Sequence, residues 1–118
     1  MAVQRISMQG PWSAIRIGKG VIKTLGNPEY ICLRVNEKRN VLAIRPCGPG
    51  DKMSFKVPPD LMDRKGIQFR IYSKQFVRSF LAWNGLSPDS CCCVDGEYSE
   101  TDHAIFFDMS KLGKYTSL

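Results

Sequence analysis

Residues 15–26 read IRIGKGVIKTLG, and residues 69–81 read FRIYSKQFVRSFL. Each segment opens with a basic residue between two apolar ones, passes a turn and continues with apolar residues at helical spacing. The first segment runs into Gly26-Asn27-Pro28, a combination that stops a helix. The two segments therefore predict the same local structure twice, a strand followed by a short basic helix.

Each of these segments is followed by two stretches typical of strands. After the first come residues 30–35 and 41–46, separated by a polar turn. After the second come CCCV and AIFFDM, separated by the turn region DGEYSETD. Each half therefore predicts a β-α-β-β unit, and the chain contains an internal repeat.

The predicted fold is one β-rich α+β domain over residues 1–118, with unit one at about 13–57 and unit two at about 67–109. A strand at about residues 3–8 precedes them, the connector LMDRKG forms one turn, and the C-terminal KLGKYTSL frays or adds a final turn. A unit of this size cannot bury a two-sided core alone. We therefore expect the units to form a compact barrel or sandwich with pseudo-two-fold symmetry.

The charge is concentrated in the first two thirds of the chain. Of 118 residues with a formal net charge of +6, residues 1–78 hold 15 of the 17 Lys and Arg but only 5 of the 11 Asp and Glu. Residues 79–118 are acidic on balance. A strongly basic segment is typical of a surface that binds a phosphate backbone, whereas scattered lysines and arginines serve only solubility.

The five cysteines indicate a reducing compartment, because their number is odd and Cys91, Cys92 and Cys93 are adjacent. A metal shared with Cys32, Cys47 or His103 is an alternative, but no CxxC pair supplies the spacing of a structural zinc site. We therefore predict buried thiols, no metal site and no cofactor.

The same sequence disfavours a membrane protein and an enzyme. No apolar run reaches the roughly 20 residues of a membrane span, and the N-terminus lacks the apolar stretch of a signal peptide, so we expect a cytoplasmic protein. Nucleophilic catalysis by the Cys91–Cys93 run with His103 is the one catalytic alternative that the residues leave open. With no GxSxG, P-loop or HExxH motif, we predict that the chain is not an enzyme.

Residues 15–46, IRIGKGVIKTLGNPEYICLRVNEKRNVLAIRP, resemble the swapped-hairpin DNA-binding domain of the AbrB, SpoVT and MraZ regulators. That domain has a strand, a Pro-Lys turn, a short helix ending in Leu-Gly and a hairpin. Residues 69–109 follow the pattern more loosely, which is similar to the tandem arrangement of MraZ. Gly18 stands in place of the family's proline, and Pro28-Glu29 in place of its Gly-Asp. The resemblance implies a transcription regulator that presents basic side chains to double-stranded DNA.

Six basic residues of the two units are the candidate DNA contacts. Arg16 and Arg70 each lie between inward-facing apolar residues of a strand, so their side chains must point outward. The other four lie at or on the short helices. The six are Arg16, Lys19, Lys23, Arg70, Lys74 and Arg78. Repeated about a two-fold axis, they would form a basic stripe matched to a duplex backbone.

The predicted hairpin of residues 30–46 carries a second basic group. Its candidate contacts are Arg34, Lys38 and Arg39, with Arg45 beside them. Hairpin tips commonly carry such residues for solubility alone, and this remains the alternative interpretation.

A protein-interaction module or inhibitor, such as an accessory protein of a mobile element that docks on a nucleic-acid enzyme, is the competing function. The positive charge would then meet an acidic protein surface. Trp83, Tyr72 and Trp12 are the candidate interface anchors, although Trp83 could instead cap the core. The sequence leaves the oligomeric state open, and a homo-oligomer is one alternative.

Overall fold

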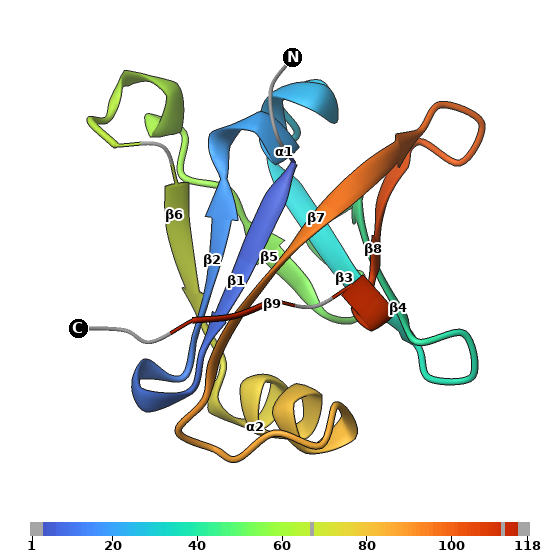
Figure 1. Cartoon of the computed structure of the whole chain (residues 1–118). Coiled ribbons are helices and arrows are strands. Elements are labelled where there is room, and N and C mark those ends of the chain that lie inside the picture. The colour runs from blue at the N-terminus through green and yellow to red at the C-terminus, as the bar shows by residue number, and fades with distance from the viewer. Residues whose placement is uncertain (1–3, 67, 112, 116–118) are drawn as a thin grey trace.

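The computed structural model describes residues 4–66, 68–111 and 113–115. Short strands dominate, and two α-helices and three 3₁₀ turns connect them (Figure 1). In chain order the elements are β1 (Arg5–Gln9), η1 (Gly10–Trp12), β2 (Ala14–Gly18), α1 (Lys19–Thr24), β3 (Tyr30–Asn36), β4 (Val41–Pro46), β5 (Ser54–Lys56), η2 (Leu61–Asp63), β6 (Gln68–Tyr72), α2 (Lys74–Trp83), β7 (Cys91–Ser99), β8 (Ala104–Asp108), η3 (Met109–Lys111) and β9 (Gly113–Tyr115).

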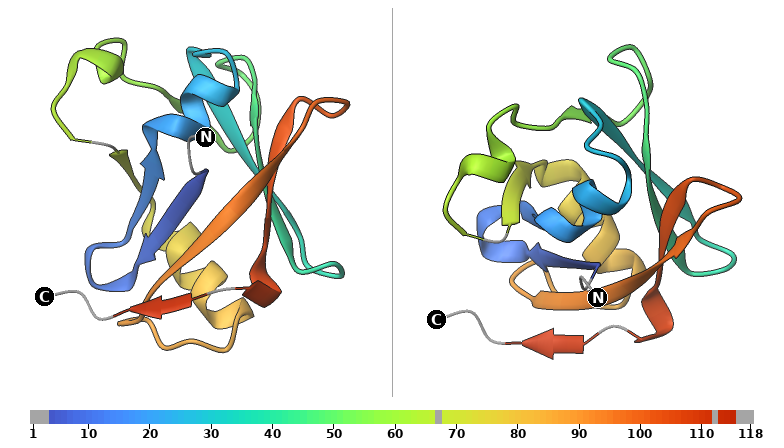
Figure 2. Two further views of the ribbon diagram at one scale, coloured as in Figure 1. Left: turned by 45° about the horizontal axis from the view of Figure 1, so that its top comes forward. Right: turned by 90° about the horizontal axis from the view of Figure 1, so that it is seen from above.

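The strands form a nearly closed antiparallel barrel. Their order is β5-β3-β4-β8-β7-β1-β2-β6, and β9 pairs with β7 outside this path. Figure 2 shows the sheet wrapped around a central axis, with β5 and β6, the two ends of the order, at the side that stays open. The predicted β-rich α+β barrel is therefore confirmed at the level of architecture.

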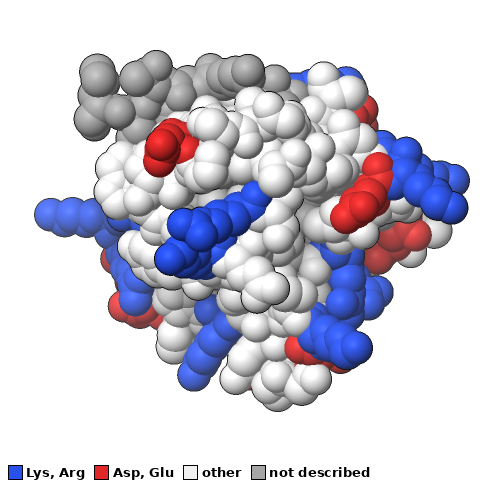
Figure 3. Space-filling view, turned by 90° about the horizontal axis from the view of Figure 1, so that it is seen from below, with Lys and Arg blue, Asp and Glu red and all other residues white. Residues whose placement is uncertain are grey.

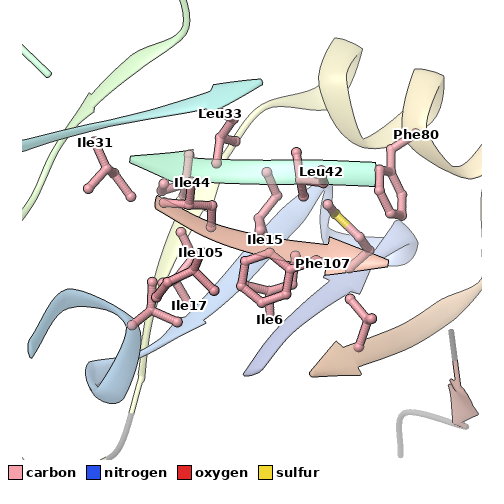
Figure 4. Packing of buried hydrophobic residues seen from close by; sticks show 14 of the residues in the cluster. Ile6, Ile15, Ile17, Ile31, Leu33, Leu42, Ile44, Phe80, Ile105 and Phe107 are labelled. Carbon is pink, nitrogen blue, oxygen red and sulfur yellow. The ribbon is translucent and has the colours of Figure 1, made fainter. Parts of the chain in front are cut away.

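The barrel interior is filled by alternate residues of strands such as β2, β4 and β8, as the period of an extended chain requires. Ile15 and Ile17 of β2 are fully buried, whereas Arg16 between them is only partly covered. Phe69 and Ile71 of β6 repeat this pattern around the exposed Arg70. Figure 4 shows the aliphatic side chains of several strands converging on Phe107 of β8.

The two helices close opposite ends of the barrel (Figures 1 and 2). α1 buries Val21 and Ile22, and α2 buries Val77, Phe80 and Leu81. The hydroxyl oxygen of Ser73 caps α2 by accepting a hydrogen bond from the backbone N–H of Phe76 at 3.4 Å. Each helix therefore contributes buried side chains to the core.

The chain termini differ in part from expectation. The N-terminal strand is present as Arg5–Gln9, while Val3 of the predicted range lies outside the described residues. The C-terminal prediction is wrong in its described part, because Gly113–Tyr115 forms β9 along Cys91–Cys93 of β7. Strand pairing uses backbone groups, so a segment with few apolar side chains can still add to a sheet edge.

The connector between the units behaves as predicted, because Leu61–Asp63 form a single 3₁₀ turn. It carries the chain across the open side of the barrel, from the end of β5 to the start of β6. Leu61 is buried, whereas Arg64, Lys65 and Gly66 are exposed. In the part of the chain that the structure describes, no helix has the length and apolar character needed to cross a bilayer.

Gly96 lies where β7 leaves β1 and begins to pair with β8. An added Cβ would lie 2.5 Å from Cε2 of Phe107 and 2.7 Å from Cγ2 of Ile105. We expect Gly96→Ala to cost about 1–3 kcal/mol through overpacking and to lower the Tm in thermal unfolding by at least about 4 °C. Gly50→Ala is the matched control, because a Cβ there meets nothing within 4 Å. Equal Tm values for the two variants would contradict the packing around Phe107.

Candidate nucleic-acid interface

Arg16 and Arg70 are brought together by the pairing of β2 with β6. The two strands are antiparallel, and Arg16 lies directly opposite Arg70 in the register. Both side chains are on the outer face, because their neighbours on either side are in the core. Two like charges directly opposite each other destabilise a sheet, so a bound anion at this position is favourable.

A groove lies beside this pair, at the open side of the barrel. It has a volume of about 650 Å³. We call it the β6 groove; its lining residues are Arg16, Pro58, Arg64, Lys65, Gly66, Phe69, Arg70 and Tyr72. Four of these eight residues are cationic, and none of the described lining residues is acidic. The groove therefore has the electrostatic character of a site for phosphate or another anion.

Three hydrogen bonds connect Arg64 and Arg70 of the groove to neighbouring elements. The Nζ of Lys19, at the start of α1, donates to the backbone carbonyl oxygen of Arg64. The Nε of Arg64 donates to Oδ1 of Asp60 at 3.0 Å, and this hydrogen bond holds the pKa of the Asp60 carboxyl below its ordinary value. The Nε of Arg70 lies 3.4 Å from Oε1 of the buried Gln9. These contacts tie the connector to α1 and link Arg70 to β1.

The remaining helix residues of the predicted stripe are not among the residues that line the groove. Lys23 is exposed at the end of α1, and Lys74 and Arg78 are exposed on α2, at the opposite end of the barrel. Figure 3 shows the molecule from below, the end that α2 covers, where basic side chains are spread among acidic and uncharged ones. The geometry thus joins Arg16 to Arg70, but it does not gather all six predicted residues in one place.

The basic hairpin lies over a different surface. Arg34 and Arg39 line a second groove of about 510 Å³, together with the half-exposed Val35 and Phe106 and with Asp102. Lys38 is exposed in the turn between β3 and β4. This surface is more apolar than the β6 groove and contains an acidic residue, so it is less suited to a phosphate backbone.

The three candidate aromatic anchors have different environments. The side chain of Tyr72 is 67% exposed and lines the β6 groove, and that of Trp12 is 51% exposed on η1. Trp83 instead packs against the core, with its ring edge-on to Phe80 at a centroid distance of 5.6 Å. Tyr72 is therefore the anchor that lies at the cationic site.

The structure places Cys91–Cys93 and His103 at different ends of β7. Cys91–Cys93 pair with β1 at one end of β7, whereas His103 lies in the turn beyond its other end. At about 3.3 Å per extended residue, the six residues from Cys93 to Ser99 span roughly 20 Å. The Nδ1 of His103 instead lies 3.0 Å from the hydroxyl oxygen of Tyr98.

Arg64 and Lys65 line the groove, although they are not among the contacts that the sequence predicts. They belong to the run Asp63-Arg64-Lys65, which sequence reasoning assigned to a connector. The sequence contains a signal for this basic site, because two adjacent cations lie shortly before a strand that carries another arginine. Only the path of the connector across the open side of the barrel places them beside Arg16 and Arg70.

The chain was compared with known proteins by sequence and by structure. No protein-family model matches it, and neither the curated proteins nor the solved structures give a significant match. The interpretation of the β6 groove therefore depends on its own geometry and charge.

The position of Arg64 can be tested through Asp60. Because the Arg64 guanidinium stabilises the charged carboxylate, we expect Arg64→Gln to raise the pKa of Asp60 toward the ordinary value of about 3.9. An NMR titration of the side-chain carboxyl carbons measures this change. Lys65→Gln is the matched control, because it removes the neighbouring charge and leaves the Arg64–Asp60 hydrogen bond in place. Equal Asp60 pKa values in the wild type and Arg64→Gln would show that the two side chains do not pair.

Proposed function

We propose that this chain is a small, non-catalytic DNA-binding protein, a regulator that holds a duplex backbone against the β2–β6 face. The observation that carries the proposal is the direct opposition of Arg16 and Arg70 beside Arg64 and Lys65 in one groove. Phosphates would offset the repulsion among these cations and release counterions from the DNA. The exposed Tyr72 at the same groove offers a hydroxyl to the backbone.

Part of the same proposal is that the two units are related by a pseudo-two-fold axis through the Arg16–Arg70 pair. Exchanging the units exchanges β2 with β6 and β4 with β8, and each of these two pairs is antiparallel. The same exchange turns the β3–β4 hairpin into the β7–β8 hairpin, and the β1–β7 pair into the β5–β3 pair. Two pairs among the described residues have no counterpart under this exchange. They are β1–β2, since β5 and β6 are the two ends of the sheet order, and β7–β9, which lies outside that order.

Such an axis supports duplex DNA as the ligand, because a duplex backbone has local two-fold axes and a symmetric protein favours a pseudo-palindromic site. It also agrees with the resemblance to the AbrB, SpoVT and MraZ domains, whose tandem form would supply both half-sites in one chain. A sheet surface that presents arginines from two adjacent strands is the feature that the resemblance implies for DNA contact.

A protein-interaction module is the second candidate function, and one observation favours it. Within residues 4–66, 68–111 and 113–115, β6 pairs with β2 alone, which leaves its other edge without a strand partner in the described structure. An extended acidic segment of a partner could add a strand there and place carboxylates near Arg64 and Lys65. This partner would bind through backbone hydrogen bonds, and its affinity would depend less on salt than that of DNA.

Fluorescence anisotropy with a labelled random-sequence duplex, at low and at moderate salt, tests DNA binding. We expect micromolar affinity that falls steeply with salt. The double variant Arg16→Ala/Arg70→Ala should remain folded and bind at least tenfold more weakly. The slope of log K against log salt should flatten by about 1.8, since each lost phosphate contact accounts for about 0.9.

The matched control is Lys38→Ala/Arg39→Ala, which removes the same charge from the exposed hairpin turn. We expect this control to leave the salt slope within about half a contact of the wild type. A loss confined to the hairpin variant would move the contact surface to the second groove. If the wild type binds no duplex even at low salt, the DNA proposal fails. A pull-down with the wild-type chain, in which the β6 edge is unchanged, then tests the protein-partner alternative.

A further inference from the structure

Cys32 lies in an unusual environment for a buried cysteine of a strand. It is completely buried, yet it is not part of the core cluster to which its neighbours Ile31 and Leu33 belong. Strand alternation places it on the outer face of β3, on the same side as Arg34. Its burial therefore comes from chain that covers this outer face, and not from the barrel interior.

The covering chain is the loop that follows β4, with the sequence Cys47-Gly-Pro-Gly-Asp51. The backbone N–H of Gly48 donates to Oδ2 of Asp51 at 2.8 Å, and the N–H of Asp51 donates to the carbonyl oxygen of Gly48 at 3.2 Å. This tight turn returns the Asp51 carboxylate to Cys47. As a result, the two sulfur atoms and a carboxylate oxygen all lie within 4.8 Å of one another.

We propose that Cys32, Cys47 and Asp51 bind a zinc ion, with water as the fourth ligand. Two sulfurs and one carboxylate oxygen are a donor set that suits Zn²⁺ and that hard cations such as Mg²⁺ and Ca²⁺ do not prefer. Tetrahedral bonds of zinc to sulfur and oxygen would set the ligand atoms about 3.6–3.8 Å apart. Since the ligand atoms lie within 4.8 Å of one another, a closure of at most about one ångström is needed, which the exposed Asp51 and the half-buried Cys47 can supply.

The charges near the three ligands also suit a divalent cation. On binding, each thiol releases its proton to solvent as its sulfur attaches to the ion, so the ligands together carry three negative charges. A divalent ion compensates two of these negative charges and leaves one uncompensated. Arg34 lies two residues from Cys32 on the same outer face of β3, so its positive charge can offset that remaining charge. The exposure of Asp51 gives the ion and its water a path from solvent.

The cysteine run on β7 does not offer an equivalent site. Cys92 is in the core cluster, and Cys91 and Cys93 lie on the opposite face between β1 and β9. Among the described residues, Cys32, Cys47 and Asp51 are the single group of three such ligands that come together. The run therefore provides a free-thiol control for the proposed site.

Titration of the purified, reduced and chelator-treated full chain with Co²⁺ tests this proposal, because cobalt reports its ligands by absorption. We expect one equivalent to bind with a thiolate-to-cobalt charge-transfer band and the visible bands of tetrahedral Co²⁺. One equivalent of Zn²⁺ should then remove both signals. Zn²⁺ should also raise the Tm, since a ligand that binds only the folded state stabilises it.

Two variants and one control assign the signal to residues. Cys47→Ser should lose at least half of the charge-transfer intensity and bind at least tenfold more weakly, and Asp51→Asn should bind at least tenfold more weakly with the band retained. Cys93→Ser, which also removes a half-buried thiol, should match the wild type. Circular dichroism of each variant checks that it is folded.

Three results would overturn the proposal. The first is a folded, reduced protein that gives no charge-transfer band. The second is a band that persists in Cys47→Ser and disappears in Cys93→Ser, which would place the metal at β7. The third is a stable Cys32–Cys47 disulfide, found by mass spectrometry, in a protein that takes up no metal after reduction.

Discussion

The pairing of β2 with β6 is the constraint on which the rest of the molecule depends. β2 also pairs with β1, but among the described residues β2 is the one strand that pairs with β6, so this pairing brings Phe69 and Ile71 of β6 into the sheet. Once Ile15 and Ile17 meet Ile71 and Phe69 in the core, the basic residues between them must lie opposite each other outside. The register of β2 and β6 therefore determines both which apolar residues meet in the interior and which basic residues meet on the surface.

Local structure could be predicted from the sequence to a considerable extent. The sequence predicts the end of α1 correctly, because glycine readily adopts the positive φ of 85° that Gly26 has there. The hairpin of β3 and β4 could be read from its alternating residues and polar turn. The C-terminal strand could not, because β9 pairs through its backbone with β7, and nothing in its side chains indicates a distant partner.

The candidate sites depend on tertiary contacts that the sequence pattern does not determine. Strand alternation predicts that Arg16 points outward, but its position opposite Arg70 follows only from a register between residues far apart in sequence. The placement of Arg64 at the groove depends on the path of a connector. The placement of Asp51 near Cys47 depends on a turn that its own carboxylate stabilises. In each case the residue type was visible, whereas the convergence came from tertiary structure.

The pairings of β7 also have a consequence for how the chain folds. Its first half pairs with β1, so that Arg5 lies opposite Asp95 across a separation of about ninety residues, and the two side chains form an ion pair at 2.7 Å. Such non-local contacts slow folding, because loop-closure entropy is lost before the contacts form. During synthesis, β1 can pair with β2 early, but its second edge stays unsatisfied until β7 has left the ribosome. The pairing of β1 is therefore completed only after all the strands between it and β7 have been made, which leaves an open strand edge on the nascent chain during that time.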